Sequence, residues 1–393
     1  MRIGIVAGEV SGDALGAGLM RALKRRLPEV RFEGIGGPAM QAEGCRSLYP
    51  MERLSLIGFE ALGKLPGLVR MRRALAAHFA ADPPDVFIGV DVPDFNLGLE
   101  AMLKAAGIRT LHYVSPTVWA WRRWRIRKIQ RAVDHMLTLF PFEAKYYRDR
   151  RVPVTFVGHP LADVIPERYD ARALRRRLAL PADATLIALL PGSRASELNR
   201  HADLFVKTAA WLVKRQPALQ FVAPFVNART RAIFETALER CRATHLPITR
   251  VIGRSRDAMA AADIVLLASG TATLEAALLK KPMVVTYRVS WFSYLLIRVL
   301  AHVRQYALPN LLAGRRIVPE LMQRDAVPEK LGQAIEQLLT HPGETRRLTG
   351  ALGRIHRMLK RNADERAAEA VIGFLKRRAR LPVRRTQTGG SRS

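Results

Sequence analysis

Short apolar runs alternate with segments of helical periodicity along most of the chain. In the first half the runs cover Arg2–Ala7, Val86–Val90, Thr110–Val114, His135–Leu139 and Thr155–Val157. In the second half they cover Leu186–Leu190, Gln220–Pro224, Ile248–Ile252, Ile264–Ala268 and Met283–Tyr287. Strands that are buried on both faces of a parallel sheet have this continuous apolar character, and the helices between them complete βαβ units. The pattern predicts an α/β protein built on doubly wound parallel sheets.

The alternation pauses in a proline-containing stretch over residues 160–181 and then restarts. A length of 393 residues suits two domains, since a domain usually takes about 100–200 residues. We therefore expect two Rossmann-like domains that face a central cleft, with ligands at the carboxyl ends of the strands. The expected N-terminal domain is residues 1–165 and the C-terminal domain is residues 166–376, followed by a disordered basic tail over residues 377–393.

The charge balance is strongly positive. The chain carries 64 Lys and Arg residues against 34 Asp and Glu residues, a formal net charge of +30. This excess indicates an anionic partner, which can be nucleic acid, an acidic membrane or a phosphorylated ligand. The only cysteines in the sequence, Cys45 and Cys241, exclude a disulfide scaffold and fit a reducing compartment.

No apolar run reaches the roughly 18 residues of a membrane-spanning helix. The apolar run at the N-terminus is short and ends in glycine, which is typical of a buried first strand rather than of a signal peptide. We therefore expect a cytosolic protein that can still attach to a membrane surface.

Some of the apolar runs end in turns rich in glycine and serine that lead into helices. The residues of these turns are Gly8, Glu9, Ser11, Gly12 and Asp13, then Gly192, Ser193 and Arg194, and then Ser269, Gly270 and Thr271. Backbone N–H groups at the start of a helix bind phosphate, and the forked arginine side chain suits the same ligand. The turns match neither G-x-G-x-x-G nor a P-loop, so they indicate anion binding without specifying a dinucleotide.

Each turn also has a structural interpretation, which the sequence leaves open. Ser11 or Asp13 can cap the following helix, and Arg194 can pair with Glu197 on the surface. Glu275, one turn into the helix after Thr271, can accept hydrogen bonds from sugar hydroxyls or can stabilise the start of that helix.

Two carboxylates follow the apolar run Val86–Val90. Asp91 and Asp94 stand at the carboxyl end of this expected strand, where a side chain can face the cleft. A carboxylate in a cleft can act as the general base for a hydroxyl nucleophile. A metal site is the weaker hypothesis, because D-x-x-D lacks the clustered ligands of a strong site, and a helix cap is the structural alternative.

Aromatic and basic residues are interleaved over residues 112–125. This cluster can stack on nucleic acid bases, lie at a membrane interface or pack between a strand and a helix. Residues 54–73 and 287–304 also combine apolar and basic side chains. A basic amphipathic surface suits anionic lipid better than a nucleic acid duplex, although each segment alone can also be a core helix.

Several of these segments together resemble the lipid-A-disaccharide synthase family, in the order that the family has them. The segments are residues 7–13, 84–96, 112–121, 189–194, 266–271 and 308–314, and the resemblance extends over residues 2–375. It implies the GT-B fold and the inverting glycosyltransferase activity of glycosyltransferase family 19.

The resemblance also implies a reaction. UDP-2,3-diacylglucosamine donates its sugar to 2,3-diacylglucosamine 1-phosphate (lipid X), which gives UDP and a β-1,6-linked tetraacyl disaccharide 1-phosphate for lipid A and lipopolysaccharide biosynthesis. The family works peripherally at the cytoplasmic face of the Gram-negative inner membrane, with neither cofactor nor metal. A homodimer is a further family-level expectation, and no specific nucleic acid partner is expected.

Asp91 is the expected catalytic base, since the resemblance gives that role to its position. The expected UDP and diphosphate contacts are Gly192, Ser193, Arg194, Ile252, Ser269, Gly270, Thr271, Glu275 and Asn310. The expected acceptor-side residues are Gly8, Glu9, Ser11, Gly12, Asp13, Asp94, Asn96 and Ser115. The expected membrane or acyl-chain contacts are Leu54, Phe59, Leu62, Leu65, Val69, Arg72 and Arg73.

Two other functions compete with this interpretation of the sequence. A UDP-N-acetylglucosamine 2-epimerase shares the GT-B fold but does not need the apolar and basic surfaces. A basic nucleic-acid-binding protein would explain the net charge of +30, but the sequence carries no RRM, KH, helix-turn-helix or zinc-finger signature.

Overall fold

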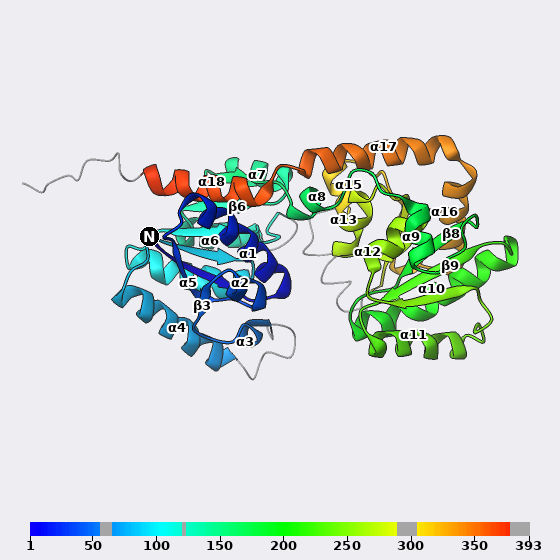
Figure 1. The fold of residues 1–393 in the computed structure, drawn as a ribbon, viewed down its shortest axis with the longest axis horizontal. Coiled ribbons are helices and arrows are strands. Elements are labelled where there is room, and N and C mark those ends of the chain that lie inside the picture. Colours follow the sequence, from blue (N-terminus) through cyan, green and yellow to red (C-terminus); the bar gives the residue numbers. More distant parts are fainter. Residues whose placement is uncertain (56–64, 120–122, 289–304, 378–393) are drawn as a thin grey trace, which may run out of the picture. The chain divides into compact units, whose positions relative to one another are not determined.

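The computed structural model describes residues 1–55, 65–119, 123–288 and 305–377. These residues form two compact units. The first unit is Met1–Pro160 together with the C-terminal segment that begins at Asn362, and the second unit is Leu161–Arg361. Each unit is built around its own parallel sheet with helices on both faces, which confirms the predicted α/β class (Figure 1).

The first unit contains a seven-stranded sheet in the order β3-β2-β1-β4-β5-β6-β7, and its paired strands are parallel. The strands are β1 (Arg2–Ala7), β2 (Arg31–Ile35), β3 (Cys45–Ser47), β4 (Val86–Val90), β5 (Thr110–Tyr113), β6 (His135–Thr138) and β7 (Val154–Phe156). The chain adds β2 and β3 on one side of β1, and it adds β5, β6 and β7 on the far side of β4, so the order of the strands reverses between β1 and β4. Such a reversal opens a crevice at the carboxyl ends of the two central strands, which is where ligands bind in this kind of sheet.

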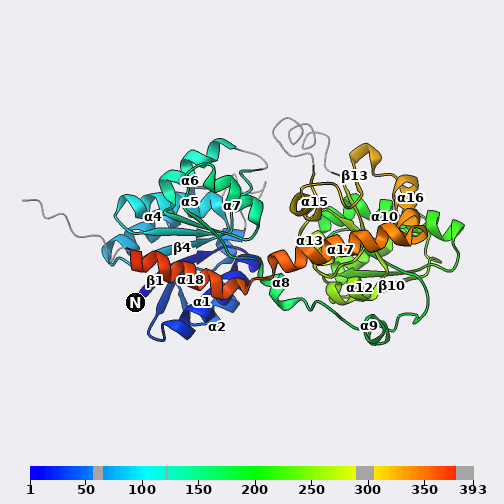
Figure 2. The ribbon, with the colours of Figure 1, turned by 90° about the horizontal axis from the view of Figure 1, so that it is seen from above.

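Helices cover both faces of the first sheet. They are α1 (Val10–Arg26), α2 (Pro38–Ala42), α3 (Glu52–Ser55), α4 (Leu65–Ala81), α5 (Pro93–Ala105), α6 (Ile126–Ala132), α7 (Pro141–Arg148) and α18 (Ala363–Lys376), with the 3-10 turn η2 (Arg123–Arg125). Figure 2 shows α4, α5 and α6 on one side of this sheet and α1, α2 and α18 on the other. The two apolar layers sandwich the strands and fix where each strand ends.

The second unit repeats this design with a six-stranded sheet in the order β10-β9-β8-β11-β12-β13. Its strands are β8 (Leu186–Leu190), β9 (Gln220–Phe225), β10 (Ile248–Ile252), β11 (Ile264–Ala268), β12 (Met283–Tyr287) and β13 (Glu320–Met322). Its helices are α8 (Pro160–Val164), α9 (Ala171–Arg177), α10 (Ala195–Arg215), α11 (Ala228–Arg240), α12 (Ser255–Ala261), α13 (Thr271–Leu278), α15 (Leu308–Ala313), α16 (Pro328–Thr340) and α17 (Pro342–Leu359), with the 3-10 turn η3 (Gln323–Asp325). The reversal of strand order lies here between β8 and β11.

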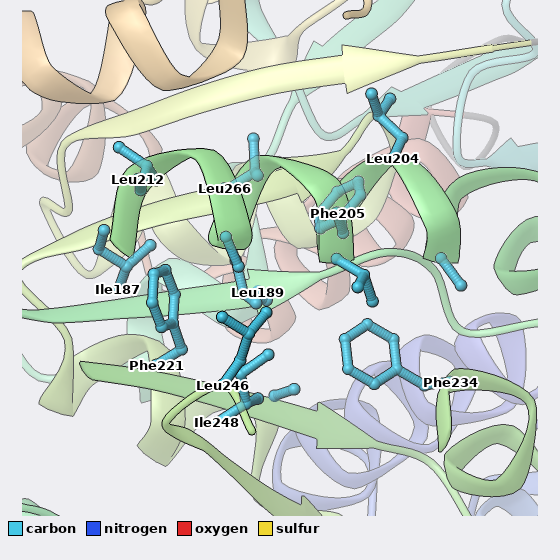
Figure 3. Packing of buried hydrophobic residues seen from close by; sticks show 14 of the residues in the cluster. Ile187, Leu189, Leu204, Phe205, Leu212, Phe221, Phe234, Leu246, Ile248 and Leu266 are labelled. Carbon is cyan, nitrogen blue, oxygen red and sulfur yellow. The ribbon is translucent and has the colours of Figure 1, made fainter. Parts of the chain in front are cut away.

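The core of the second unit explains the strong apolar periodicity of its sequence. Figure 3 shows Phe205 and Leu212 of α10 packed near Ile187 and Leu189 of β8, and all of these side chains are fully buried. Burial of such a side chain contributes about 1.5–3 kcal/mol, so this layer holds the end of β8 firmly in place.

The predicted boundary of the C-terminal domain is wrong at its far end. We expected residues 166–376 to form one domain, but α18 belongs to the first unit. Its apolar stripe, which includes Val371 and Phe374, joins the core that Leu19 of α1 and Ile5 of β1 also form. The predicted tail, apart from Arg377, lies outside the described residues.

Within the described residues, no helix has both the length and the apolar character that crossing a membrane would require.

Candidate active site

The strand β4 ends in a strained turn. Asp91 and Val92 directly follow this strand and have φ angles of 54° and 43°, both in the left-handed region. Val114, just after the neighbouring strand β5, has a φ of 80°. Left-handed backbone is unfavourable for residues other than glycine, above all for β-branched ones, and costs about 1–3 kcal/mol where it is kept. Strain of this kind gathers at functional sites, and here it surrounds the predicted base Asp91, whose side chain is half-buried.

Hydrogen bonds hold this turn from two directions. The N–H of Asp91 donates to the carbonyl oxygen of Tyr113 over 2.8 Å. Asn96, on the first turn of α5, donates from Nδ2 to the carbonyl oxygen of Asp91 over 2.8 Å and to that of Val6 over 3.1 Å. Asn96 is fully buried, so it lies beneath the turn and supports it. Our expectation that Asn96 faces the acceptor is therefore wrong.

The first turn of α1 lies beside Asp91. We expected a loop up to Asp13, but the helix already begins at Val10. A Cβ added to Gly8 would come within 2.7 Å of Val92 Cγ2, and one added to Gly12 within 3.8 Å of Asp91 Cβ. These glycines let the turn after β1 and the turn after β4 approach each other. Glu9 and Ser11 are exposed at this helix start.

Other predicted acceptor-side residues have structural roles. Asp13 is buried and caps α2, since Oδ1 accepts from the N–H groups of Gly37 at 2.9 Å and Met40 at 3.0 Å. Its Oδ2 accepts from a third backbone N–H, that of Ala39. Asp13 is thus a helix cap, but of a helix distant in sequence rather than of its own, and the acceptor-side expectation for it is wrong.

Ser115 and Asp94 are also engaged. Ser115 is buried, and its hydroxyl lies 3.0 Å from the hydroxyl of Tyr147. Asp94 is exposed on α5 and accepts from Arg125 Nη2 at 2.6 Å. Asp91 is the predicted carboxylate that stands on the strained turn itself, whereas Asp94 has entered the helix.

Glu143 is a buried acid that the sequence analysis missed. It lies in the first turn of α7, after β6, and its Oε2 accepts from the N–H of Phe140 at 3.2 Å. Burial raises the pKa of Glu143 to about 8. Hydrogen-bonding groups in the backbone of Phe140 and Leu139 and in the side chains of Trp119 and Ser115 partly oppose this rise. The sequence signal was the glutamate three residues into a helix that opens with proline, which is the spacing of a capping box.

A cavity of about 530 Å³ lies at the carboxyl ends of β8, β9 and β11 in the second unit. This volume lies within the range of about 300–1,000 Å³ that is usual for small-molecule sites. Separate stretches of the sequence meet here, and the predicted residues on its wall are Gly192, Ser193, Arg194, Ser269, Gly270, Thr271 and Glu275. The wall also includes residues that we did not predict, namely Leu190, Glu197, Pro224, Phe225, Val226, Gly253, Ser255, Met259, Ala268 and Ala272.

Glu197 organises one wall of this cavity. Its Oε2 accepts from the N–H of Ser193 at 2.9 Å and from that of Arg194 at 3.4 Å. Its Oε1 lies 3.6 Å from Arg194 Nη1, so the surface pairing that the sequence allowed does occur. The Arg194 side chain is nevertheless 76% exposed, and it remains accessible to an anion.

The remaining predicted nucleotide contacts separate into two cases. Ile252 ends β10 with half of its surface exposed, and the next residue, Gly253, lines the cavity. Asn310 is fully buried, donates to the carbonyl oxygen of Val318 and to Glu320, and accepts from the N–H groups of Ile317 and Val318. These contacts occupy its amide, so Asn310 orders the loop before β13 and is not a ligand contact here.

Glu275, the predicted sugar contact, lines the same cavity. It stands on α13, with its side chain 22% exposed. Its Oε2 lies 3.7 Å from Arg256 Nε, so this carboxylate has a cationic neighbour within the second unit.

Four of the seven predicted membrane contacts have side chains that the structure describes, namely Leu54, Val69, Arg72 and Arg73. Leu54 is 1% exposed and packs in the core of the first unit, so the expectation that it meets a membrane is wrong. Phe59, Leu62 and the side chain of Leu65 lie outside the described residues. On α4, Val69 and Arg72 are half-buried, and Arg73 is exposed.

In the described part of the chain, no group of three or more His, Cys, Asp or Glu side chains is arranged to hold a metal ion.

Comparison with known proteins decides the family. The sequence matches the family described as lipid-A-disaccharide synthetase over residues 3–371. This chain belongs to that family. The lipid-A-disaccharide synthase of Methylobacillus flagellatus is 50% identical over 375 residues, which are 95% of this chain and 99% of that protein. The synthase of Pseudomonas aeruginosa PAO1 is 50% identical over 379 residues, which are 96% and 99% of the two chains.

Solved structures resemble this one in fold alone. UDP-GlcNAc 2-epimerase from Neisseria meningitidis has a TM-score of 0.62 at 13% identity, with 96% of this chain and 100% of that chain covered. MurG from Acinetobacter baumannii has a TM-score of 0.53 at 13% identity, with coverage of 96% and 99%. These neighbours confirm the predicted GT-B fold.

Membership of the lipid-A-disaccharide synthetase family confirms the predicted enzyme class, a UDP-sugar glycosyltransferase of lipid A biosynthesis. The same membership favours this activity over the epimerase and nucleic-acid-binding alternatives.

Proposed function

We propose that the chain transfers 2,3-diacylglucosamine from UDP-2,3-diacylglucosamine to lipid X, with Asp91 as the general base and the cavity of the second unit as the UDP site. The observation that carries the proposal is the pairing of family membership with two sites at the reversals of strand order, one in each unit. The product is a β-1,6-linked tetraacyl disaccharide 1-phosphate, and UDP leaves.

Asp91 suits the role of base for three structural reasons. It follows β4 at the reversal of strand order, its backbone is held in an unfavourable conformation, and its side chain is half-buried rather than free in solvent. In the proposed step the carboxylate takes the proton of the acceptor 6-hydroxyl while the oxygen attacks the anomeric carbon and the bond to UDP breaks. General-base assistance of this kind is worth about 10²–10⁴-fold in rate.

The cavity in the second unit suits UDP. The N–H groups at the start of α13 and the exposed guanidinium of Arg194 can stabilise the charge of the departing diphosphate, whereas the N–H groups of Ser193 and Arg194 before α10 already donate to Glu197. Glu275 is the proposed partner of the ribose hydroxyls. Because these groups supply positive potential, we propose that the transfer needs no metal ion or other cofactor.

The substrates set where the enzyme works. Each carries two acyl chains, and every buried CH₂ group is worth about 0.8 kcal/mol, so transfer of long chains into water is prohibitive. We propose that the protein acts at the anionic cytoplasmic surface of the inner membrane, where each nearby basic residue adds about 1 kcal/mol of attraction. Within the described residues, Arg70 and Arg73 on the exposed side of α4 are candidates for this contact.

Product analysis tests the proposal. The purified protein is incubated with UDP-2,3-diacylglucosamine and lipid X in mixed micelles that contain a metal chelator, and the products are identified by mass. The proposal predicts the tetraacyl disaccharide 1-phosphate and one UDP for each disaccharide. The proposal would be contradicted if the protein formed an epimerised UDP-sugar and no disaccharide. It would also be contradicted if no product formed with both substrates present.

A further inference from the structure

A buried polar cluster lies one layer below Asp91. Asn96 and Glu100 stand one turn apart on α5, and both face Gly89, the fourth residue of β4. A Cβ added to Gly89 would come within 2.2 Å of Glu100 Oε1 and 3.0 Å of Asn96 Cβ. Because Gly89 has no side chain, the side chains of Asn96 and Glu100 can pack directly against β4.

Glu100 reaches across β4 to the neighbouring strand. Gly89 is paired in register with His112 of β5, and His112 Nδ1 lies 2.7 Å from Glu100 Oε1. Both side chains have no exposed surface. Burial raises the pKa of Glu100, and the charge and hydrogen bond of His112 oppose that shift. The pair therefore ties α5 to β5 across β4, at the level of Gly89.

The cluster is costly for the fold. Asn96 Oδ1, Glu100 Oε2 and His112 Nε2 are all buried without a hydrogen-bond partner among the described residues. An unsatisfied buried polar group destabilises the folded state, whereas well-packed apolar residues in place of a buried ion pair are often neutral or stabilising. Stability alone therefore does not explain why a polar pair stands in this core.

We propose that Glu100 and His112 are positioning residues that fix α5 on the sheet so that Asn96 holds the strained turn of Asp91. This inference rests on the proposed role of Asp91 as the base. A hydrogen bond is directional, and it sets the helix against the strands more narrowly than apolar contacts do. The chain of contacts runs from His112 to Glu100, then one helical turn along α5 to Asn96, and from its amide to the carbonyl oxygen of Asp91.

A double replacement separates positioning from folding. Glu100→Met combined with His112→Leu keeps similar side-chain volumes and removes the pair without leaving one charge unpaired. We expect a thermal midpoint at or above that of the parent, and UDP affinity and KM for both substrates within about twofold. We expect kcat to fall at least about tenfold, since misplacement of a catalytic group by 1 Å can cost about 100-fold.

A conservative replacement should rescue the rate. In His112→Asn the side-chain amide can either donate to Glu100 or accept from it, so we expect kcat to stay within about threefold of the parent. The matched control is His78→Leu, which breaks a second Glu–His contact of the first unit, 2.9 Å long, between α4 and Glu33 of β2. This control should leave kcat unchanged.

Asp91→Asn is measured in parallel and in combination with the double replacement. If the pair acts through Asp91, the combined variant is no slower than Asp91→Asn alone, because groups that act as a unit are not additive. Parental kcat in the folded double variant overturns the inference, as does a His112→Asn variant that is no faster than the double variant. The inference is also overturned if the double variant loses kcat but also has a lower thermal midpoint and weaker UDP binding than the parent. Full activity of Asp91→Asn instead overturns the proposed role of Asp91.

Discussion

Gly192 lines the cavity in the second unit, and its replacement by alanine should strongly destabilise that unit. Its φ is 143°, in a region that L residues rarely adopt. A Cβ at this position would lie 2.5 Å from Glu197 Cβ and 2.9 Å from Glu197 Oε2. Real Cβ atoms do not approach other atoms that closely, so either the turn or the first part of α10 has to move.

The cost follows from two separate effects. An unfavourable backbone conformation costs about 1–3 kcal/mol, and an extra methyl group forced into a packed site costs about 1–3 kcal/mol. If Glu197 moves, the N–H of Ser193 also loses the acceptor that it now has at 2.9 Å. We therefore expect Gly192→Ala to lower the free energy of unfolding of the second unit by about 2–5 kcal/mol.

The matched control is Gly270→Ala, in the same cavity at the end of the neighbouring strand β11. Gly270 has a φ of 162°, which is extended backbone, and a Cβ there would meet nothing within 4 Å. We expect this variant to lose less than about 1 kcal/mol of stability, the usual scale of a change at a helix N-cap, but to bind UDP more weakly because the methyl group enters the cavity. Urea unfolding and UDP titration measure both quantities. A Gly192→Ala variant within about 0.5 kcal/mol of the parent would refute the steric reasoning.

Three further predictions follow from the same sites. Arg194→Ala should weaken UDP binding about 10- to 100-fold, since hydrogen bonds to charged groups are worth about 1.5–3 kcal/mol; unchanged affinity in a calorimetric titration would remove Arg194 from the site. Transfer should continue at the parental rate in excess chelator, and a loss that magnesium restores would contradict the metal-free mechanism. Burial raises the pKa of Glu143 from its ordinary 4.5 to about 8, so between these values the folded chain holds a proton that the unfolded chain has released. Glu143 therefore lowers the stability of the fold increasingly as the pH rises from 4.5 toward 8. In thermal melts, the stability of Glu143→Gln relative to the parent should grow from pH 5 to pH 8. A stability difference that does not change with pH would contradict the raised pKa.

The sequence predicted the central strands closely because both of their faces are buried. The bounds of β1, β4, β8, β11 and β12 agree with the expected ones. Those of β10 agree as well, although β10 is an edge strand and most of its residues are only half-buried. The strand β2 was missed because it interrupts the apolar pattern with Glu33, a buried carboxylate that contacts His78 and lies within 4 Å of Arg2 and Arg46. A pattern that counts apolar residues cannot detect a strand whose buried charge is satisfied by distant partners.

Some residues of the candidate site could be predicted from the sequence, and others could not. Strand ends were predictable, so seven of the residues that line the cavity of the second unit were found from their turns, while ten others on its wall were not. The roles of Asp13 and Asn310 were not predictable, because their hydrogen-bond partners lie on elements that local spacing does not reveal. From the neighbouring sequence alone, both residues look like ligand contacts. In the fold, Asp13 and Asn310 instead accept hydrogen bonds from buried backbone N–H groups.

The central claim is that Asp91 removes the proton from the acceptor hydroxyl, and single-turnover kinetics of Asp91→Asn test it most directly. The control is Asp94→Asn, which changes the nearby carboxylate that pairs with Arg125 on α5. We predict that Asp91→Asn keeps UDP affinity within about twofold while the rate of disaccharide formation falls about 10²–10⁴-fold, and that Asp94→Asn stays close to the parent. A near-parental rate for Asp91→Asn, measured on folded protein that binds UDP, would contradict the account.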